Sequence, residues 1–133
     1  MSPELSQGVV EGFFDRFVEA FATFDAAEVA SLFMTPGVAL RSDATPVALT
    51  SRADVLNYYQ AALNRYREGG CVGCQWDDLT LTGMGNASVL AAVTWTLRRH
   101  DGSNLANWRQ SYCLAATSDG LKIYASAAHS TAR

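Results

Sequence analysis

The stretch "DRFVEAFATFDAAEVASLF", residues 15–33, decides the fold class. With the residues just before it, this stretch spaces apolar side chains by three and four positions, which is the period of one helix face: Val10, Phe13, Phe14, Phe17, Val18 and Phe21. Asp25 and Glu28 then form a capping-box pattern. We therefore predict a long helix and a shorter one that ends at "TPG" (35–37), with three further side chains facing inward: Val29, Leu32 and Phe33.

A third helix and a change of period follow. Two short apolar strands, "GVAL" (37–40) and "PVAL" (46–49), precede "SRAD" (51–54), where Ser51 and Asp54 make a second capping box. The helix that starts there carries Val55, Tyr59, Ala62, Leu63 and Tyr66 at helical spacing and stops at "EGG" (68–70). From residue 71 the apolar residues alternate with a period of two, in four runs separated by the turn sequences "GMGN", "HDGSN" and "SDG". These runs predict a four-stranded antiparallel meander.

The predicted order is α-α-β-β-α-β-β-β-β, an α+β fold in which three helices pack on a curved antiparallel sheet. The chain has 133 residues, of which 49% are hydrophobic and 17% charged. That size and composition suit one compact domain with its own core. We expect residues 1–133 to form a single domain without repeats or linkers.

Charge and cysteine content narrow the class of protein. The net charge is -3, and the arginines are scattered among acidic residues, so no basic patch for nucleic acid or an anionic membrane is expected. The opening residues lack a signal-peptide pattern, and no run approaches the roughly eighteen apolar residues of a membrane span. Three cysteines cannot form a complete disulfide framework. We expect a cytoplasmic protein.

The run "SVLAAVTWTLRR" (88–99) has apolar residues on both faces. One face carries five apolar residues in alternation: Val89, Ala91, Val93, Trp95 and Leu97. The other carries Leu90 and Ala92 among threonines, so it is not simply a solvated face. A second half-apolar face on so small a chain suggests that a second copy covers it. We therefore predict a homodimer formed through the sheet.

This order of elements resembles the nuclear transport factor two-like superfamily, which includes SnoaL-type cyclases, ketosteroid isomerase and scytalone dehydratase. The resemblance covers nearly the whole chain and rests on four segments: "DRFVEAFATFDAAEVASLF", "SRADVLNYYQAAL", "NWRQSYCLAAT" and "LKIYASAAHS". It implies a conical fold whose sheet and helices enclose a mostly apolar pocket. The fold does not define the reaction, so function depends on the polar groups in that pocket.

The resemblance argues against steroid isomerisation. The position of that enzyme's oxyanion tyrosine falls on Phe17, which cannot donate a hydrogen bond. Its protonated aspartate falls near Gln110, and its base falls on Ser42, or on Asp43 only if the turn shifts by one residue. We therefore do not expect this activity, although Phe17 should still line the pocket.

Two titratable residues are candidate general bases. Asp43 lies in "LRSDATP" (40–46), where it is either a turn residue that bonds nearby amides or a base with a raised pKa inside the pocket. His129 has the parity of Ile123, Ala125 and Ala127. It is either a hydrogen-bonded edge histidine or a proton carrier at the pocket rim.

Five other residues are candidates for contact with a ligand. Trp108, Gln110 and Tyr112 share one face of the fifth strand, and the resemblance places that face toward the pocket. A buried glutamine needs a partner, so Gln110 implies a ligand, a water or a side chain within hydrogen-bond reach. Tyr58 and Tyr59 occupy positions that the family places at the pocket wall, and at least one should point inward.

The remaining conspicuous residues are expected to be structural. The sulfurs of "CVGC" (71–74) would point to opposite faces of a regular strand, so packing cysteines are favoured over a redox or zinc site unless a bulge intervenes. "WDD" (76–78) fits a solvated strand edge, His100 fits a hairpin turn, and Arg52 fits the first turn of its helix.

Two functions of different classes remain. The first is binding of a small apolar or aromatic molecule without chemistry. The second is a cofactor-independent isomerase, cyclase, dehydratase or hydrolase with Asp43 or His129 as the base and Gln110 with a tyrosine stabilising negative charge. A pure dimerisation module fits less well. We expect no cofactor and no metal in either case.

Overall fold

The computed structural model of the protein describes residues 5–130 and shows the predicted order of elements. Three helices and six strands follow one another along the chain: α1 (Gln7–Phe21), α2 (Ala26–Ala30), β1 (Phe33–Leu40), β2 (Pro46–Leu49), α3 (Arg52–Glu68), β3 (Cys71–Met84), β4 (Ser88–Arg99), β5 (Asn104–Thr117) and β6 (Gly120–Ala128). The fold is α+β, as predicted.

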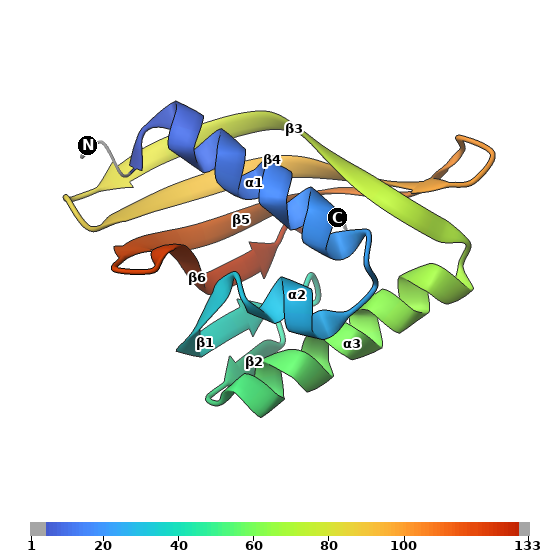
Figure 1. The fold of residues 1–133 in the computed structure, drawn as a ribbon, viewed down its shortest axis with the longest axis horizontal. Coiled ribbons are helices and arrows are strands. Elements are labelled where there is room, and N and C mark those ends of the chain that lie inside the picture. The colour runs from blue at the N-terminus through green and yellow to red at the C-terminus, as the bar shows by residue number, and fades with distance from the viewer. Residues whose placement is uncertain (1–4, 131–133) are drawn as a thin grey trace.

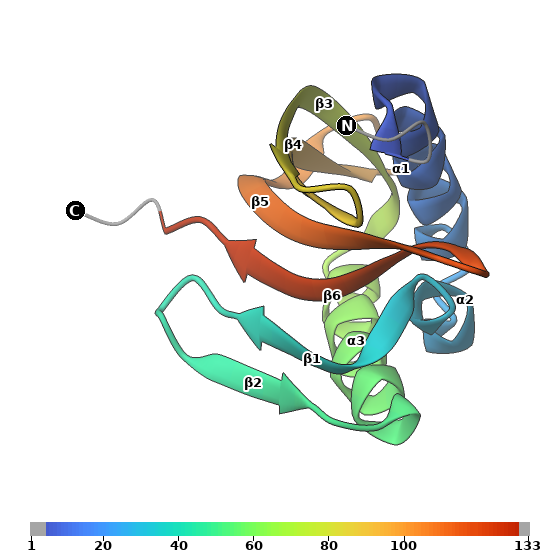
Figure 2. The ribbon, with the colours of Figure 1, turned by 90° about the vertical axis from the view of Figure 1, so that its left-hand side faces the viewer.

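The strands form one strongly curved sheet in the order β2-β1-β6-β5-β4-β3. All neighbouring strands are antiparallel except β1 and β6, which are parallel. The last four strands make the predicted meander, and the β1–β2 hairpin extends the sheet beside β6 (Figure 1). The three helices lie together on one side of the sheet, so the other face is left uncovered by helices (Figure 2).

The helix starts follow the predicted caps, with one difference. Ser51 and Asp54 form a complete capping box at the start of α3. At α2 the Asp25 side chain accepts the Ala27 amide, but the amide of Asp25 donates to Thr23 Oγ1 rather than to Glu28. The expected extension of α2 to "TPG" is wrong: α2 ends at Ala30, and β1 already begins at Phe33.

A bulge in β6 changes which residues share a face. Cys113 pairs with Ala125 and Leu114 with Ile123, so Tyr124 is an extra residue in β6. Ile123 therefore faces the helices, whereas Ala125 lies on the opposite face. The predicted common face of Ile123 and His129 is wrong, because one inserted residue reverses the alternation for the rest of the strand.

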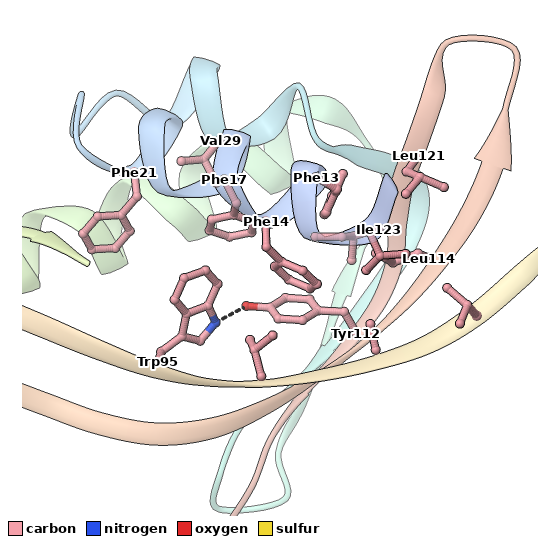
Figure 3. Packing of buried hydrophobic residues seen from close by; sticks show 14 of the residues in the cluster. Phe13, Phe14, Phe17, Phe21, Val29, Trp95, Tyr112, Leu114, Leu121 and Ile123 are labelled. Carbon is pink, nitrogen blue, oxygen red and sulfur yellow. Dashed lines mark hydrogen bonds between the residues drawn. The ribbon is translucent and has the colours of Figure 1, made fainter. Parts of the chain in front are cut away.

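The core lies between α1 and the inner face of the sheet. Phe14 is fully buried, and its ring centroid lies 5.5 Å from that of Tyr112 and 6.1 Å from that of Trp95. Figure 3 shows Phe14 over the Tyr112 ring, with the indole of Trp95 hydrogen-bonded to the tyrosine hydroxyl. Large aromatic pairs of this kind contribute both apolar burial and ring contacts.

Candidate functional site: an aromatic cavity between α3 and the sheet

A cavity of about 350 Å³ lies between α1, α3 and the inner face of the sheet. Among the described residues, eight aromatic side chains line it: Phe17, Phe21, Tyr58, Tyr59, Tyr66, Trp95, Trp108 and Tyr112. The polar residues of the lining are Gln110 and Asn107 of β5, Ser126 of β6, and four exposed residues, Arg41, Ser42, Arg65 and His129. The volume falls in the range of small-molecule sites in proteins.

The six residues expected to contact a ligand all line this cavity. α1 supplies Phe17, α3 supplies Tyr58 and Tyr59, and β5 supplies Trp108, Gln110 and Tyr112. Five further lining residues were not singled out from the sequence as cavity residues. Helical spacing brings Arg65 and Tyr66 of α3 to the same wall, the sheet adds Trp95 and Ser126, and the β1–β2 turn adds Arg41.

Two indole N–H groups orient the polar side chains inside the cavity. Trp108 Nε1 donates to Gln110 Oε1 at 2.7 Å, and Trp95 Nε1 donates to the Tyr112 hydroxyl at 2.8 Å. An indole nitrogen only donates, so both partners must accept. The amide of Gln110 and the ring of Tyr112 are thereby held in one orientation before any ligand arrives.

Tyr59 also interacts with the side chain of Ser126. Burial raises the pKa of Tyr59 above its ordinary value, and the interaction with Ser126 only partly opposes this shift. Burial likewise raises the pKa of Tyr112 and of Tyr66. The three phenols therefore stay protonated near neutral pH, so they offer neutral hydrogen-bonding groups rather than negative charge.

Asp43 lies in the exposed β1–β2 turn and is not among the residues that line the cavity. Its Oδ1 accepts the backbone N–H of Thr45 at 2.9 Å. Hydrogen bonds from Thr45 hold the pKa of Asp43 below its ordinary value. This is the geometry of a turn aspartate, and the lowered pKa makes the carboxylate a weaker base rather than a stronger one.

His129 is an exposed residue of the cavity lining, and its Nε2 is 2.7 Å from Ser111 Oγ. Its amide N–H donates to the Arg109 carbonyl, which continues the β6 pairing by one residue. Ser111 belongs to the outer face of the sheet, because its neighbours Gln110 and Tyr112 line the cavity. The imidazole therefore sits at the edge between the cavity opening and the outer face.

The cysteines of "CVGC" pack in the core. A register shift between Cys71 and Gly73 brings Cys71 and Cys74 to the same side of β3, so the expectation that they point to opposite faces is wrong. Both are free thiols, and burial raises the pKa of Cys71 and that of Cys74, the latter to about 12. Within residues 5–130, no three His, Cys, Asp or Glu side chains are grouped so that they could hold a metal ion.

These buried acids predict loss of stability in alkali. A thiol or phenol whose pKa is higher in the folded than in the unfolded chain stabilises the fold below its unfolded pKa, and that stabilisation is lost as pH rises toward the folded value. For Cys74 the window runs from about pH 9 to about pH 12, and Tyr66 adds to it above about pH 10. We expect the thermal midpoint to fall steadily above pH 9. A Cys74→Ala variant should show a shallower fall between pH 9 and 10, and an unchanged slope would contradict this assignment.

The fold and the cavity define a class: an α+β cone whose curved sheet and helices enclose an aromatic pocket. Residues 5–131 match the family described as NTF2-like protein (DUF6841), and the chain belongs to this family. A comparison with curated proteins found no match. In the described part of the chain, no helix is long and apolar enough to cross a membrane.

Solved structures with the same fold are distant in sequence. Aln2 from a Streptomyces species is 18% identical with a TM-score of 0.77, covering 98% of this chain and 93% of that one. A protein of Streptomyces avermitilis, inferred to be a dehydratase of the NTF2-like family, is 16% identical with a TM-score of 0.71 over 99% and 100% of the two chains. An NTF2-like protein with a cystatin-like fold from Novosphingobium aromaticivorans is 13% identical with a TM-score of 0.72 over 92% and 79%. At these identities the likeness shows the fold alone.

Proposed function

We propose that the protein binds a small apolar, ring-containing molecule in this cavity and that the cavity is its functional site. The observation that carries the proposal is the wall of eight aromatic side chains around about 350 Å³, with Gln110 and Tyr112 held in fixed orientations. Aromatic walls supply apolar contact area, and a few fixed polar groups orient the ligand. Steroid isomerisation does not fit, since Phe17 has no hydroxyl and Asp43 lies outside the lining.

Calorimetric titration with 9-fluorenone, a planar apolar ketone, tests the proposal. We expect saturable binding at one site per chain. Heats that rise without saturating, or no heat at all, at probe concentrations up to its solubility limit would contradict the proposal.

A second function, cofactor-independent catalysis, is favoured by the position of His129. His129 is an exposed residue of the cavity lining whose Nε2 lies within hydrogen-bond distance of Ser111, and we propose that the imidazole exchanges a proton with a ligand at the rim. The Streptomyces avermitilis structure gives a dehydratase as one reaction class for this alternative. Once a substrate is in hand, His129→Asn should abolish turnover without abolishing binding, whereas Asp43→Asn should leave both unchanged. Equal turnover in all three proteins would remove His129 as the base.

We also propose that two copies associate through the outer face of the sheet. Val38 and Leu40 of β1 are 42% and 40% exposed and pair with Ala125 and Ala127 of β6, which lie on the same face. Leu90 of β4 pairs with Cys113 of β5, which pairs with Ala125, so Leu90 lies on this face too, and no helix covers it (Figure 2). A second copy is the simplest cover for such a surface on a chain of this size.

Light scattering after size-exclusion chromatography tests the dimer. We expect a mass of twice 14.3 kDa for the wild type and a shift toward 14.3 kDa for Leu40→Asp, because a buried unpaired carboxylate opposes association. Met84→Asp is a matched control, since Met84 is also 40% exposed but lies at the end of β3, the far edge strand. A monomeric wild type, or equal effects of the two variants, would contradict the proposed interface.

A further inference from the structure

Inside the cavity, the hydrogen-bonding groups that have no partner in the protein are donors. Trp108 Nε1–H can only donate, so the 2.7 Å contact places Oε1, not Nε2, of Gln110 beside the indole. The two N–H groups of Gln110 Nε2 then have no acceptor among the described residues. Gln110 therefore presents hydrogen-bond donors to whatever occupies the cavity.

Tyr112 presents a donor for the same reason. Its hydroxyl oxygen accepts from Trp95 Nε1 at 2.8 Å, and Trp95 is its hydrogen-bond partner within the described residues. The single hydroxyl hydrogen remains, and burial keeps it in place by raising the pKa of the phenol. Tyr112 and Gln110 lie two residues apart on the same face of β5, so their donors serve one region of the cavity.

The opening of the cavity is cationic. Arg41 and Arg65 line the cavity and are both exposed, so their charges lie where the cavity meets solvent, and no aspartate or glutamate lines it among residues 5–130. Asp43 is the carboxylate that interacts electrostatically with Arg41, but it is exposed and already bonded to Thr45. Neither guanidinium hydrogen-bonds or ion-pairs with another described side chain. Two exposed arginines of one cavity lining that have no such partners favour an anionic group beside them.

The other polar groups of the lining do not change this preference for a ligand that accepts hydrogen bonds and carries negative charge. Tyr59 interacts with the side chain of Ser126, and Asn107, the neighbour of Trp108, points to the opposite face of β5, where its Nδ2 donates to Thr96 at 2.8 Å. Ser42 and His129 at the rim can donate as well as accept. The cavity therefore offers donors in its interior and positive charge at its opening, and a ligand that brought only donors would leave these groups unpaired.

We propose that the ligand is an apolar ring-containing carboxylate that also carries a carbonyl-type oxygen. The carbonyl oxygen accepts from Gln110 and Tyr112 inside, and the carboxylate stays at the opening beside Arg41 and Arg65, where it remains partly hydrated. This inference rests on the proposed binding function and adds the charge and the polarity of the ligand.

Three matched probes separate the two parts of the proposal: 9-fluorenone-2-carboxylate, fluorene-2-carboxylate, which lacks the carbonyl, and 9-fluorenone, which lacks the charge. By calorimetry at pH 8 and low salt, we expect the first to bind most tightly. Loss of either group should weaken binding by about two- to tenfold, the range of one hydrogen bond or of exposed ion pairs. The advantage of the carboxylate should shrink when sodium chloride is raised to about 0.5 M, because salt screens exposed charges.

Variants assign the two effects to residues. The double variant Arg41→Gln with Arg65→Gln should bring the affinity for 9-fluorenone-2-carboxylate down to about that of 9-fluorenone, whose own affinity should hardly change. Arg52→Gln is the matched control, because Arg52 lies on the same helix as Arg65 but outside this cavity. Gln110→Glu keeps an acceptor for Trp108 and removes the two donors. The affinity for 9-fluorenone-2-carboxylate should therefore fall by more than about tenfold.

The outcomes distinguish the inference from the function on which it rests. Saturable binding of 9-fluorenone with no gain from the carboxylate would leave the binding function standing and overturn the anionic ligand. A gain that survives the double arginine variant, or that Arg52→Gln removes equally, would also overturn it. Equal binding of fluorene-2-carboxylate and 9-fluorenone-2-carboxylate would overturn the carbonyl assignment. Absence of binding by all three probes would contradict the binding function itself.

Discussion

Replacing Phe14 with alanine is expected to lower the free energy of unfolding by about 3–5 kcal/mol. Phe14 is fully buried, and its ring contacts those of Phe13, Trp76, Trp95 and Tyr112. Removing it opens a void between α1 and the sheet that its aromatic neighbours cannot fill without leaving their own partners. A loss of this size is a large part of the stability of a domain of 133 residues.

Urea unfolding followed by circular dichroism measures this loss. Val9→Ala is the control on the same helix, since Val9 is 42% exposed and its replacement should change stability by less than about 0.5 kcal/mol. If the free energy of unfolding of Phe14→Ala lies within about 1 kcal/mol of the wild-type value, then the core between α1 and the sheet does not hold the fold together.

Filling the cavity should abolish ligand binding without unfolding the protein. Ala62 lies on α3 and lines the cavity between the tyrosines of that helix. In Ala62→Trp the indole has space to occupy, so the cost of overpacking is small while the ligand is excluded. We expect the affinity for 9-fluorenone to fall by at least about a hundredfold, with a thermal midpoint close to that of the wild type.

The neighbouring residue on the helix is the control. Ala61 is exposed and does not line the cavity, so Ala61→Trp adds the same side chain outside it. This variant should bind 9-fluorenone as the wild type does. If the two tryptophan variants bind equally well, the probe occupies another place; if both lose binding, the effect is not one of cavity volume.

Local signals were sufficient for most of the fold. The aromatic spacing of α1 and the Ser51–Asp54 capping box depend on residues within one or two turns, so they can be read directly from the sequence. The turn sequences between the last strands are equally local. The length of α2 was overestimated because Leu32 and Phe33 keep an apolar spacing after the helix has ended and the chain has entered β1.

Predicting the site from the sequence was harder than predicting the fold, because the positions of its residues depend more on how the strands pair. The cavity position of Gln110 follows from regular alternation in β5, whereas the outward face of Ala125 follows from an extra residue in β6 that only strand pairing reveals. Arg65 was missed because a charged residue on a helix is typical of a solvated face, although its spacing from Tyr58 places it on the cavity side.

The indole signals of the three tryptophans give the most direct test of the central claim, that a small apolar molecule binds in this cavity. Trp95 and Trp108 line it, whereas Trp76 does not and donates instead to Asp15 at 3.0 Å. In ¹H–¹⁵N NMR spectra assigned with single tryptophan-to-phenylalanine variants, titration with 9-fluorenone should shift the Trp95 and Trp108 indole N–H signals in a saturable way and leave that of Trp76 in place. Saturation with no shift at Trp95 and Trp108, or an equal shift at Trp76, would contradict the account.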